Sequence, residues 1–367
     1  FKPYLVRSTD RGKTWESIAS DLPERHLLWR IVQDHEEAAL LFVATEFGVY
    51  ASVDAGTSWQ KVPGSPTIPF RDLAIQTREN DLVGATFGRG FYVLDDYTPL
   101  RLAAQQTAKP EDILLCPVRR TWLYVEDRPL GGPKGYQGDD FFNAKNPMYG
   151  AVLTYYLAEG METALSKRKQ QEAKVKKAQG DNVYPGWDEL KQEEREESPA
   201  LLIIVKDAAG QVVDQFTGPT SEGMHRVAWD LRYSRSLGGG LALPGEYTFT
   251  AAKRTADGLT PIGNVVSFTV VPALPSSLPI NDREDTLAFQ KQAAELSRIA
   301  TGTTSKLSEV LDQVKAIKSA LRSEPQVPTT LYDRSRQLDI KITDIQETML
   351  GNSTKQKRDQ IATYPII

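Results

Sequence analysis

The sequence contains one cysteine, three histidines and no long hydrophobic run, and each shortage excludes a class of protein. Cys116 alone can form neither a disulfide within the chain nor a thiolate cage for a metal. Three histidines argue against a histidine-ligated metal centre. A membrane-spanning helix needs about 20 mostly apolar residues, and no segment supplies them. We therefore expect no cofactor, no metal site and no membrane span.

The charges are nearly balanced, with 44 Lys and Arg against 48 Asp and Glu and a net charge of −4. This balance gives no reason to expect nucleic acid as a partner. A composition of 40% hydrophobic and 25% charged residues is typical of globular proteins. At about 100–200 residues per domain, the 367 residues predict two or three domains.

An eight-residue motif occurs twice in the first third of the chain, at residues 8–15 and 52–59. Both copies fit Ser-x-Asp-x-Gly-x-Ser/Thr-Trp, and they start 44 residues apart. The motif residues are Ser8, Asp10, Gly12, Thr14 and Trp15 in the first copy and Ser52, Asp54, Gly56, Ser58 and Trp59 in the second.

This motif has the composition of a hairpin turn. Short Asp and Ser side chains accept backbone N–H groups at turns, and Gly adopts a positive φ without steric cost. The closing tryptophan begins the next strand and can cover the turn with its ring. We therefore expect Asp10 and Asp54 to be structural rather than catalytic.

The spacing of the motif indicates a β-propeller. A repeat of about 40–45 residues built from short strands is typical of four-stranded propeller blades. A third, weaker copy follows, because Ala44–Tyr50 recurs as Ala85–Tyr92, and Asp95 then corresponds to Asp54. The predicted strands lie near residues 4–8 and 15–18, then 29–33, 40–45, 48–52 and 59–62, then 71–76, 82–86 and 90–95. About two and a half blades cannot close a ring, so we expect the open edge to be covered by missing blades or by a second copy.

The octapeptides resemble the Asp-box (BNR) repeats of sialidases, of propeller endoglucanases such as xyloglucanases, and of the sortilin/Vps10 domain. The order of parts is similar to that of large bacterial proteins labelled "glycosyl hydrolase, BNR repeat" or sortilin-like. The resemblance covers residues 1–100. It implies a propeller with its Asp-boxes on the outer rim, away from the central pocket, and an extracytoplasmic location (periplasmic, outer surface or secreted).

No catalytic set can be assigned within this chain. A sialidase needs an arginine triad and a Tyr/Glu pair, and most glycosidases need two facing carboxylates. We therefore expect a fragment of a larger protein that acts as a structural module or binds a glycan or a peptide. The alternative is the C-terminal part of a sialidase- or xyloglucanase-like glycoside hydrolase, with its catalytic carboxylates upstream of Phe1.

Arg89 is the candidate ligand-binding residue. It lies between Gly88 and Gly90, two residues that permit close backbone approach. One interpretation directs Arg89 toward the central channel and an anionic or carbonyl ligand. The other is a hairpin arginine that donates to a carbonyl of a neighbouring blade.

The rest of the chain predicts three further parts. Residues 101–145 read as a linker that packs on the propeller. Residues 146–272 read as an antiparallel β-sandwich of immunoglobulin or fibronectin III type, with Trp229 in its core. The run Val227–Arg232 and the turn at Leu243–Tyr247 resemble the Ig-like domain of flagellar hook-capping proteins.

Two helical segments are also predicted. Residues 159–198 are inserted into the sandwich, basic in their first half and acidic in their second, as in a solvated helical hairpin. Residues 281–352 show apolar stripes at helical spacing and predict a helical hairpin or bundle of three segments. The open propeller edge or these helices are the candidate surfaces for homo-oligomer formation.

Overall fold

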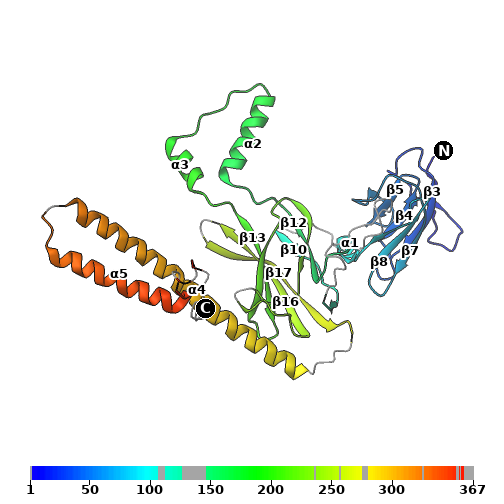
Figure 1. Ribbon diagram of the computed structural model, residues 1–367. Coiled ribbons are helices and arrows are strands. Elements are labelled where there is room, and N and C mark those ends of the chain that lie inside the picture. Colours follow the sequence, from blue (N-terminus) through cyan, green and yellow to red (C-terminus); the bar gives the residue numbers. More distant parts are fainter. Residues whose placement is uncertain are drawn as a thin grey trace. The chain divides into compact units, whose positions relative to one another are not determined.

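The computed structural model describes residues 2–105, 112–125, 146–234, 237–255, 258–274, 280–324 and 326–352, together with Lys355, Lys357 and Arg358. The chain divides into two compact units. Unit 1 comprises Phe1–Leu231 and Pro244–Ser276, and unit 2 comprises Arg232–Leu243 and Ser277–Ile367. Strands dominate unit 1, whereas a pair of helices dominates unit 2 (Figure 1).

Unit 1 begins with three antiparallel sheets. The first pairs β1 (Val6–Arg7) with β2 (Glu16–Ser17). The second has the order β3 (Leu28–Gln33), β4 (Leu41–Thr45), β5 (Gly48–Ser52) and β6 (Gln60–Lys61). The third has the order β7 (Phe70–Gln76), β8 (Asp81–Thr86) and β9 (Phe91–Leu94). Within the described ranges the third sheet ends at β9, without a fourth strand.

The first two sheets repeat with the same register. Val6 lies opposite Ser17 in the first sheet, and Tyr50, 44 residues after Val6, lies opposite Lys61, 44 residues after Ser17. The octapeptide turn joins the two strands in both cases. A sequence repeat of 44 residues is thus a structural repeat of 44 residues.

The third sheet repeats the second, but the repeat distance differs by one residue between its strands. Strand β8 repeats β4 after 41 residues, whereas β9 repeats β5 after 42 residues. The additional residue lies in the Gly88–Gly90 turn. Asp54 therefore corresponds to Asp96, and the predicted correspondence with Asp95 is wrong by one residue.

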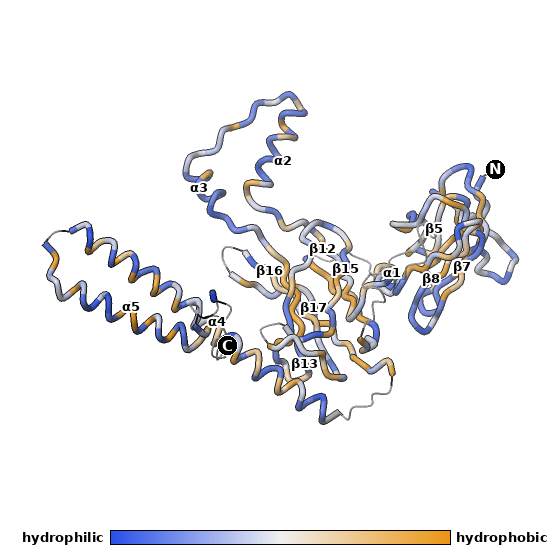
Figure 2. Tube along the Cα trace, in the orientation of Figure 1, coloured by the Kyte–Doolittle hydropathy of each residue, from blue (hydrophilic) through white to orange (hydrophobic). Residues whose placement is uncertain are grey.

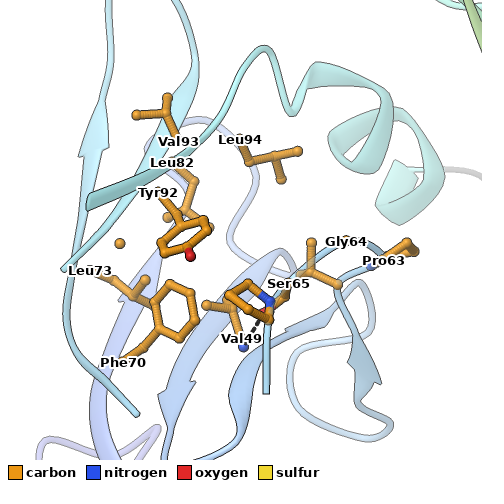
Figure 3. A pocket seen from close by; sticks show the side chains of 13 residues that line it. Val49, Pro63, Gly64, Ser65, Phe70, Leu73, Leu82, Tyr92, Val93 and Leu94 are labelled. Carbon is orange, nitrogen blue, oxygen red and sulfur yellow. Dashed lines mark hydrogen bonds between the residues drawn. The ribbon is translucent and has the colours of Figure 1, made fainter. Parts of the chain in front are cut away.

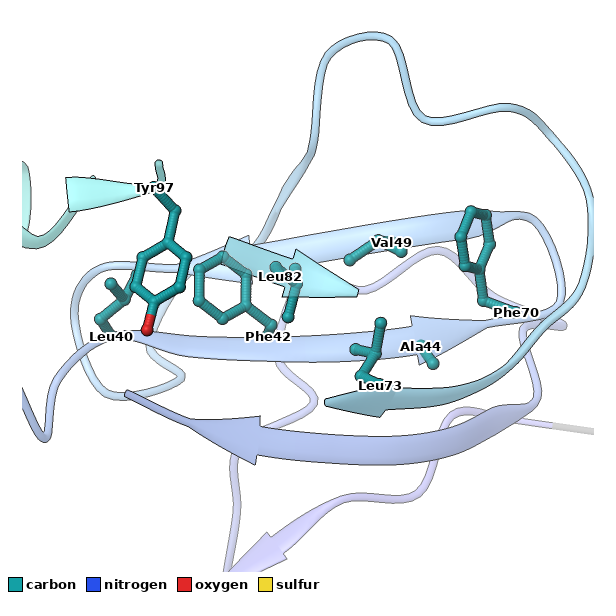
Figure 4. Close-up of a cluster of buried hydrophobic side chains, with 8 residues drawn as sticks. All are labelled: Leu40, Phe42, Ala44, Val49, Phe70, Leu73, Leu82 and Tyr97. Carbon is teal, nitrogen blue, oxygen red and sulfur yellow. The ribbon is translucent and has the colours of Figure 1, made fainter. Parts of the chain in front are cut away.

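Strand β4 is buried on both of its faces. Phe42 and Ala44 point toward the third sheet and join a hydrophobic cluster with Phe70 and Leu82 (Figure 4). The alternate residues of β4 point the other way, into a second cluster that contains Trp59. A strand covered on both faces carries a continuous apolar run instead of an alternating pattern, as β4 does.

Helix α1 (Thr98–Gln105) is held to the second sheet by a buried ion pair. Arg101 donates from Nε and Nη2 to the two carboxylate oxygens of Asp34, at 2.7 and 2.8 Å. The Tyr97 hydroxyl donates to the same carboxylate at 2.7 Å, and the Glu37 N–H donates at 2.8 Å. The Asp34 side chain is fully buried, so these bonds replace the water that it has lost.

The remainder of unit 1 forms two further sheets. One has the order β10 (Ile113–Leu115), β12 (Ala151–Leu157) and β15 (Gly223–Trp229). The other has the order β11 (Thr121–Leu123), β17 (Gly258–Pro272), β16 (Gly245–Thr255), β13 (Ala200–Asp207) and β14 (Val212–Gly218). Within the segment predicted to be a linker, β10 and β11 thus each add a strand to one of these sheets.

Trp229 connects the two sheets through its ring. It is 1% exposed, as predicted for a core residue. Its ring centroid lies 5.0 Å from that of Tyr247 and 6.3 Å from that of Phe268, both on the other sheet. Aromatic contacts at this distance stabilise the core beyond the area that they bury.

The charged insertion contains the two expected helices, α2 (Ala164–Lys177) and α3 (Trp187–Arg195). Thr163 caps α2 by accepting the Ser166 N–H. Arg168 donates to both carboxylate oxygens of Glu193 at 2.7 Å, which joins the basic helix to the acidic one. In Figure 2 most of α2 is coloured hydrophilic, whereas the strands of the sheets contain many hydrophobic residues.

Unit 2 contains α4 (Ile280–Ser323) and α5 (Thr329–Leu350), which pack as an antiparallel pair (Figure 1). Val314 and Ile342 are buried in this unit. The prediction of three helical segments is wrong, because α4 continues through residues 297–306, where no proline interrupts it. No described helix is both long and apolar enough to cross a membrane.

Candidate functional site

The two octapeptide turns contain the same four side-chain hydrogen bonds. In the first copy the Ser8 hydroxyl donates to Asp10 Oδ1 and accepts the Gly12 N–H. Thr14 donates from its N–H to Asp10 Oδ1 at 2.8 Å and from its hydroxyl to Oδ2 at 2.7 Å. In the second copy the equivalent bonds join Ser52, Asp54, Gly56 and Ser58, at 2.6 to 2.8 Å.

Both turns also share their backbone conformation and their electrostatics. Gly12 and Gly56 have φ of 83° and 91°, and the residue before each glycine has a positive φ as well. The hydrogen bonds from the Thr14 N–H and hydroxyl lower the pKa of Asp10 to about 2. A carboxylate that already accepts several short bonds is a poor proton carrier at neutral pH, so this geometry suits a turn.

The tryptophans that close the two turns differ in their surroundings. Trp59 is 5% exposed, donates its ring N–H to the Ile18 carbonyl at 2.8 Å and donates its backbone N–H to Asp21. Trp15 is 63% exposed, and its ring N–H returns to the Gly12 carbonyl of its own turn at 3.2 Å. The tryptophan of the motif is therefore buried in the second copy and exposed to solvent in the first.

Arg89 lies at the tip of the β8–β9 turn and is exposed. It has no hydrogen bond or ion pair with any residue in the described part of the chain. Gly88 and Gly90 on either side have φ of 80° and 70°, a conformation that favours glycine. The guanidinium donors of Arg89 thus face solvent.

Two β-bulges repeat at equivalent places in the second and third sheets. In β3, Leu28 and Arg30 lie opposite consecutive residues of β4, so Trp29 is the extra residue. In β7 the same irregularity makes Arg71 the extra residue. A bulge redirects a side chain out of the regular pleat, and bulges are common next to binding sites.

The two bulge residues stack on each other. The guanidinium carbon of Arg71 lies 3.7 Å from the Trp29 ring centroid and 5.3 Å from that of Phe87. We call these three residues the aromatic–arginine stack. Trp29 and Phe87 remain 41% and 69% exposed, and Phe87 is two residues before Arg89.

The stack offers two kinds of contact to a ligand. Its exposed aromatic surface can pack against an apolar face, and Arg71 has no hydrogen-bond acceptor among the described residues. Its N–H donors are therefore available to ligand oxygens. Trp29, Arg71 and Phe87 were not identified as site residues from the sequence, because a bulge leaves no distinct mark on the composition of a strand.

The described residues contain no group of three or more His, Cys, Asp or Glu side chains placed to hold a metal ion.

Comparison with known proteins gives one short sequence match. No family model matches the chain. Xyloglucanase Xgh74A from Acetivibrio thermocellus, found twice, is 33% identical over 70 residues. The match covers 17% of this chain, and the chain spans only 8% of the length of these relatives.

Solved structures give low similarity. The extracellular domain of a one component system from B. thetaiotaomicron aligns with 75% of this chain and 29% of that domain, at 15% identity and a TM-score of 0.21. The BSP domain of a biofilm associated protein aligns with 67% of this chain and 25% of that domain, at 8% identity and a TM-score of 0.18. Scores this low do not indicate a shared overall fold.

Proposed function

We propose that this chain is a segment of a large extracytoplasmic Asp-box β-propeller protein and serves as a structural and ligand-binding module. The observation that carries the proposal is the pair of octapeptide turns, which share hydrogen bonds, backbone conformation and strand register at a spacing of 44 residues. The three N-terminal sheets are then parts of consecutive blades. The Asp-box residues act as turn formers in this proposal.

The other parts of the chain are accessory modules in this proposal. Residues 101–145 connect the blades to the next domain, and residues 146–272 form an Ig-like sandwich with the helical insertion 159–198. Residues 281–352 add the helical hairpin. The ring contacts of Trp229 across two sheets support the sandwich.

We place the ligand at the aromatic–arginine stack, and we favour a glycan over a peptide. Sugars present apolar ring faces and hydroxyl groups, which match the exposed indole of Trp29 and the open donors of Arg71. The 70-residue match to a protein named xyloglucanase supports the same choice. Arg89, beside the stack, is a further contact for a ligand oxygen.

Binding of xyloglucan oligosaccharides to the full chain, measured by calorimetry, tests this assignment. Trp29→Ala and Phe87→Ala should each weaken binding by about tenfold or more, because exposed aromatics supply most of the contact area. Trp187→Ala removes a tryptophan in α3 that is more exposed than Trp29, at 74%, and should leave binding unchanged. No saturable binding, or equal binding by Trp29→Ala and the unaltered chain, would refute the assignment. Unchanged binding by Arg89→Ala would remove Arg89 alone from it.

A second candidate is the C-terminal part of a propeller glycoside hydrolase, and the xyloglucanase match favours it. Such an enzyme needs two carboxylates about 5–5.5 Å or 6.5–9.5 Å apart, supplied by the larger protein. Release of reducing ends from xyloglucan by that protein, lost when either carboxylate is substituted, would support the hydrolase. Binding without release would support the first proposal.

A further inference from the structure

A hollow lies between the second and third sheets, in unit 1. Its volume is about 160 Å³, and apolar side chains line most of it. Figure 3 shows the rings of Phe70 and Tyr92 and the turn at Pro63–Ser65 around the hollow. The Ser65 hydroxyl accepts the Val49 N–H at 2.9 Å and thereby fixes this turn.

The wall of the hollow repeats the surroundings of Trp59. The cluster around Trp59 contains eight other residues, and each has a counterpart 41 to 44 residues later that lines the hollow. The pairs are Leu5 and Val49, Ile18 and Val62, Ala19 and Pro63, Leu22 and Pro66, Leu28 and Phe70, Leu41 and Leu82, Val43 and Gly84, and Tyr50 and Tyr92. The tryptophan is the one member of the cluster without a counterpart.

The missing tryptophan explains why the space is empty. After Leu94 the chain enters α1 at Thr98 instead of making an octapeptide turn and a fourth strand. The walls of the site are therefore complete, while no side chain of the described residues takes the place of the tryptophan. A cavity of roughly 150 Å³ is large enough for a benzene-sized ring, so the hollow has room for an aromatic side chain.

Strand β9, which adjoins the hollow, has an unpaired edge in the described residues. Within the described ranges β9 pairs only with β8, and Phe91 and Val93 are 76% and 51% exposed. In the second sheet the Val62 N–H donates to the carbonyl of Val49, whose counterpart on β9 is Phe91. Backbone groups of alternate residues point to the same edge, so Phe91 and Val93 present theirs to the free side.

We propose that the hollow and the free edge of β9 form an acceptor site for a tryptophan-led strand. The occupant is an extended segment of the octapeptide type that adds antiparallel to β9, as in strand-addition complexes. Its residue after the tryptophan would lie opposite Val93, as Gln60 lies opposite Ala51. Its indole would fill the space between Phe70, Leu82 and Tyr92.

The acceptor for the indole N–H is also present. In the filled site Trp59 donates to the carbonyl of Ile18, and the counterpart of that carbonyl belongs to Val62. The Val62 carbonyl accepts the Ser65 N–H at 3.1 Å and has a second lone pair. This inference depends on the repeat and not on a glycan ligand.

The chain's own second repeat supplies the probe. A labelled synthetic peptide of residues 52–63, titrated into the full chain and followed by fluorescence anisotropy, should bind with saturation. The same peptide carrying Trp59→Ala should bind at least about tenfold more weakly, since it buries no indole. A peptide N-methylated at Val62, which removes the N–H intended for Phe91, should be weakened as well.

Two protein variants complete the test. Val62→Trp places an indole in the hollow from its own wall and should reduce peptide binding at least about tenfold. Val212→Trp adds an indole to an exposed position of β14 and should change nothing. Circular dichroism checks that both variants fold, and the two altered peptides remain decisive if Val62→Trp does not.

The proposal is overturned by any of three results: no saturable binding, equal affinity of the Trp59→Ala peptide, or equal affinity of the Val62→Trp protein. If the chain self-associates and Val62→Trp abolishes this self-association, the occupant is a second copy of the chain. That result would also overturn the assignment to a separate strand. Oligosaccharide binding should be unaffected by Val62→Trp, so failure here and failure of the glycan site are distinguishable.

Discussion

The two octapeptide tryptophans provide a matched pair of substitutions whose effects should differ widely. Trp59 is 5% exposed and bonds to Ile18, so Trp59→Ala leaves a large cavity and an unpaired carbonyl. Truncating a buried aromatic costs about 3–5 kcal/mol of the free energy of unfolding. Trp15 is 63% exposed and bonds only within its own turn, so Trp15→Ala should cost less than about 1 kcal/mol.

Urea unfolding followed by circular dichroism measures both effects without depending on tryptophan fluorescence. Hydrogen exchange in β4 and β5 assigns the loss to the second sheet, because a chain with two compact units need not unfold in a single step. Trp59→Phe keeps the aromatic ring and loses the hydrogen bond, so it should cost about 1–2 kcal/mol.

Equal costs for Trp59→Ala and Trp15→Ala would refute this reasoning. They would mean that Trp15 is covered in solution, or that the packing of Trp59 on Ile18 contributes little. A cost below about 1 kcal/mol for Trp59→Ala would mean that the packing of Trp59 on Ile18 contributes little. The surroundings of Trp59 could then no longer be used to interpret the hollow beside β9.

The remaining predictions concern buried and turn-forming groups. Asp34→Ala should cost about 3–5 kcal/mol in urea unfolding, because it removes two hydrogen-bond acceptors from the buried Arg101 guanidinium and leaves it only the largely exposed Glu36 as a carboxylate partner among the described residues. Glu36→Gln should cost less than about 1 kcal/mol. Burial alone would raise the pKa of Asp34, but the hydrogen bonds from Arg101 hold this pKa well below its usual range. The stabilisation by ionised Asp34 should therefore persist above about pH 4 and decline as the pH falls below it. Asp34→Asn should reduce this loss of stability at acid pH. Burial raises the pKa of the Cys116 thiol to about 11, so a disulfide reagent at pH 8 should modify it only after denaturation; native reaction at the denatured rate would contradict this. Asp54→Ala should cost about 1–3 kcal/mol, with Asp54→Asn less costly, and equal costs in a melting experiment would count against the turn-forming role.

The strands of the first three sheets were predictable because their signals are local. Each octapeptide closes its hydrogen bonds within four residues, so the turn forms from its own sequence wherever it occurs. The spacing of two such turns then sets the register of the strands between them. The one-residue error at Asp96 arose in the Gly88–Gly90 turn, where glycines permit an insertion that leaves no mark on the strand pattern.

The aromatic–arginine stack was not predictable for a related reason. A bulge adds one residue to a strand without changing its composition, so Trp29 and Arg71 look like ordinary strand positions in the sequence. Their contact also joins two sheets, and the two residues are 42 positions apart.

The continuity of the long helix α4 was not predicted from the sequence. The apolar stripe weakens between Leu296 and Leu307, where polar and small residues follow one another, and this gap predicts a break. In the structure two threonines in the gap donate their hydroxyls to carbonyls four residues earlier, Thr303 to Ile299 at 2.8 Å and Thr304 to Ala300 at 2.9 Å. Such side chains stay within the helix, so a loss of periodicity without proline does not end it.

Packing between neighbouring repeats accounts for both the exposed Trp15 and the hollow beside β9. The segment after one sheet, such as Ile18–Leu22, covers the tryptophan of the next, so each contact needs a tryptophan from one repeat and a wall from the repeat before it. In the described residues the first repeat has the tryptophan without the wall, and the third has the wall without the tryptophan. The octapeptide therefore determines its own turn, whereas the preceding repeat determines whether its tryptophan is buried, and a substitution in Ile18 should destabilise the second turn while leaving the first unchanged.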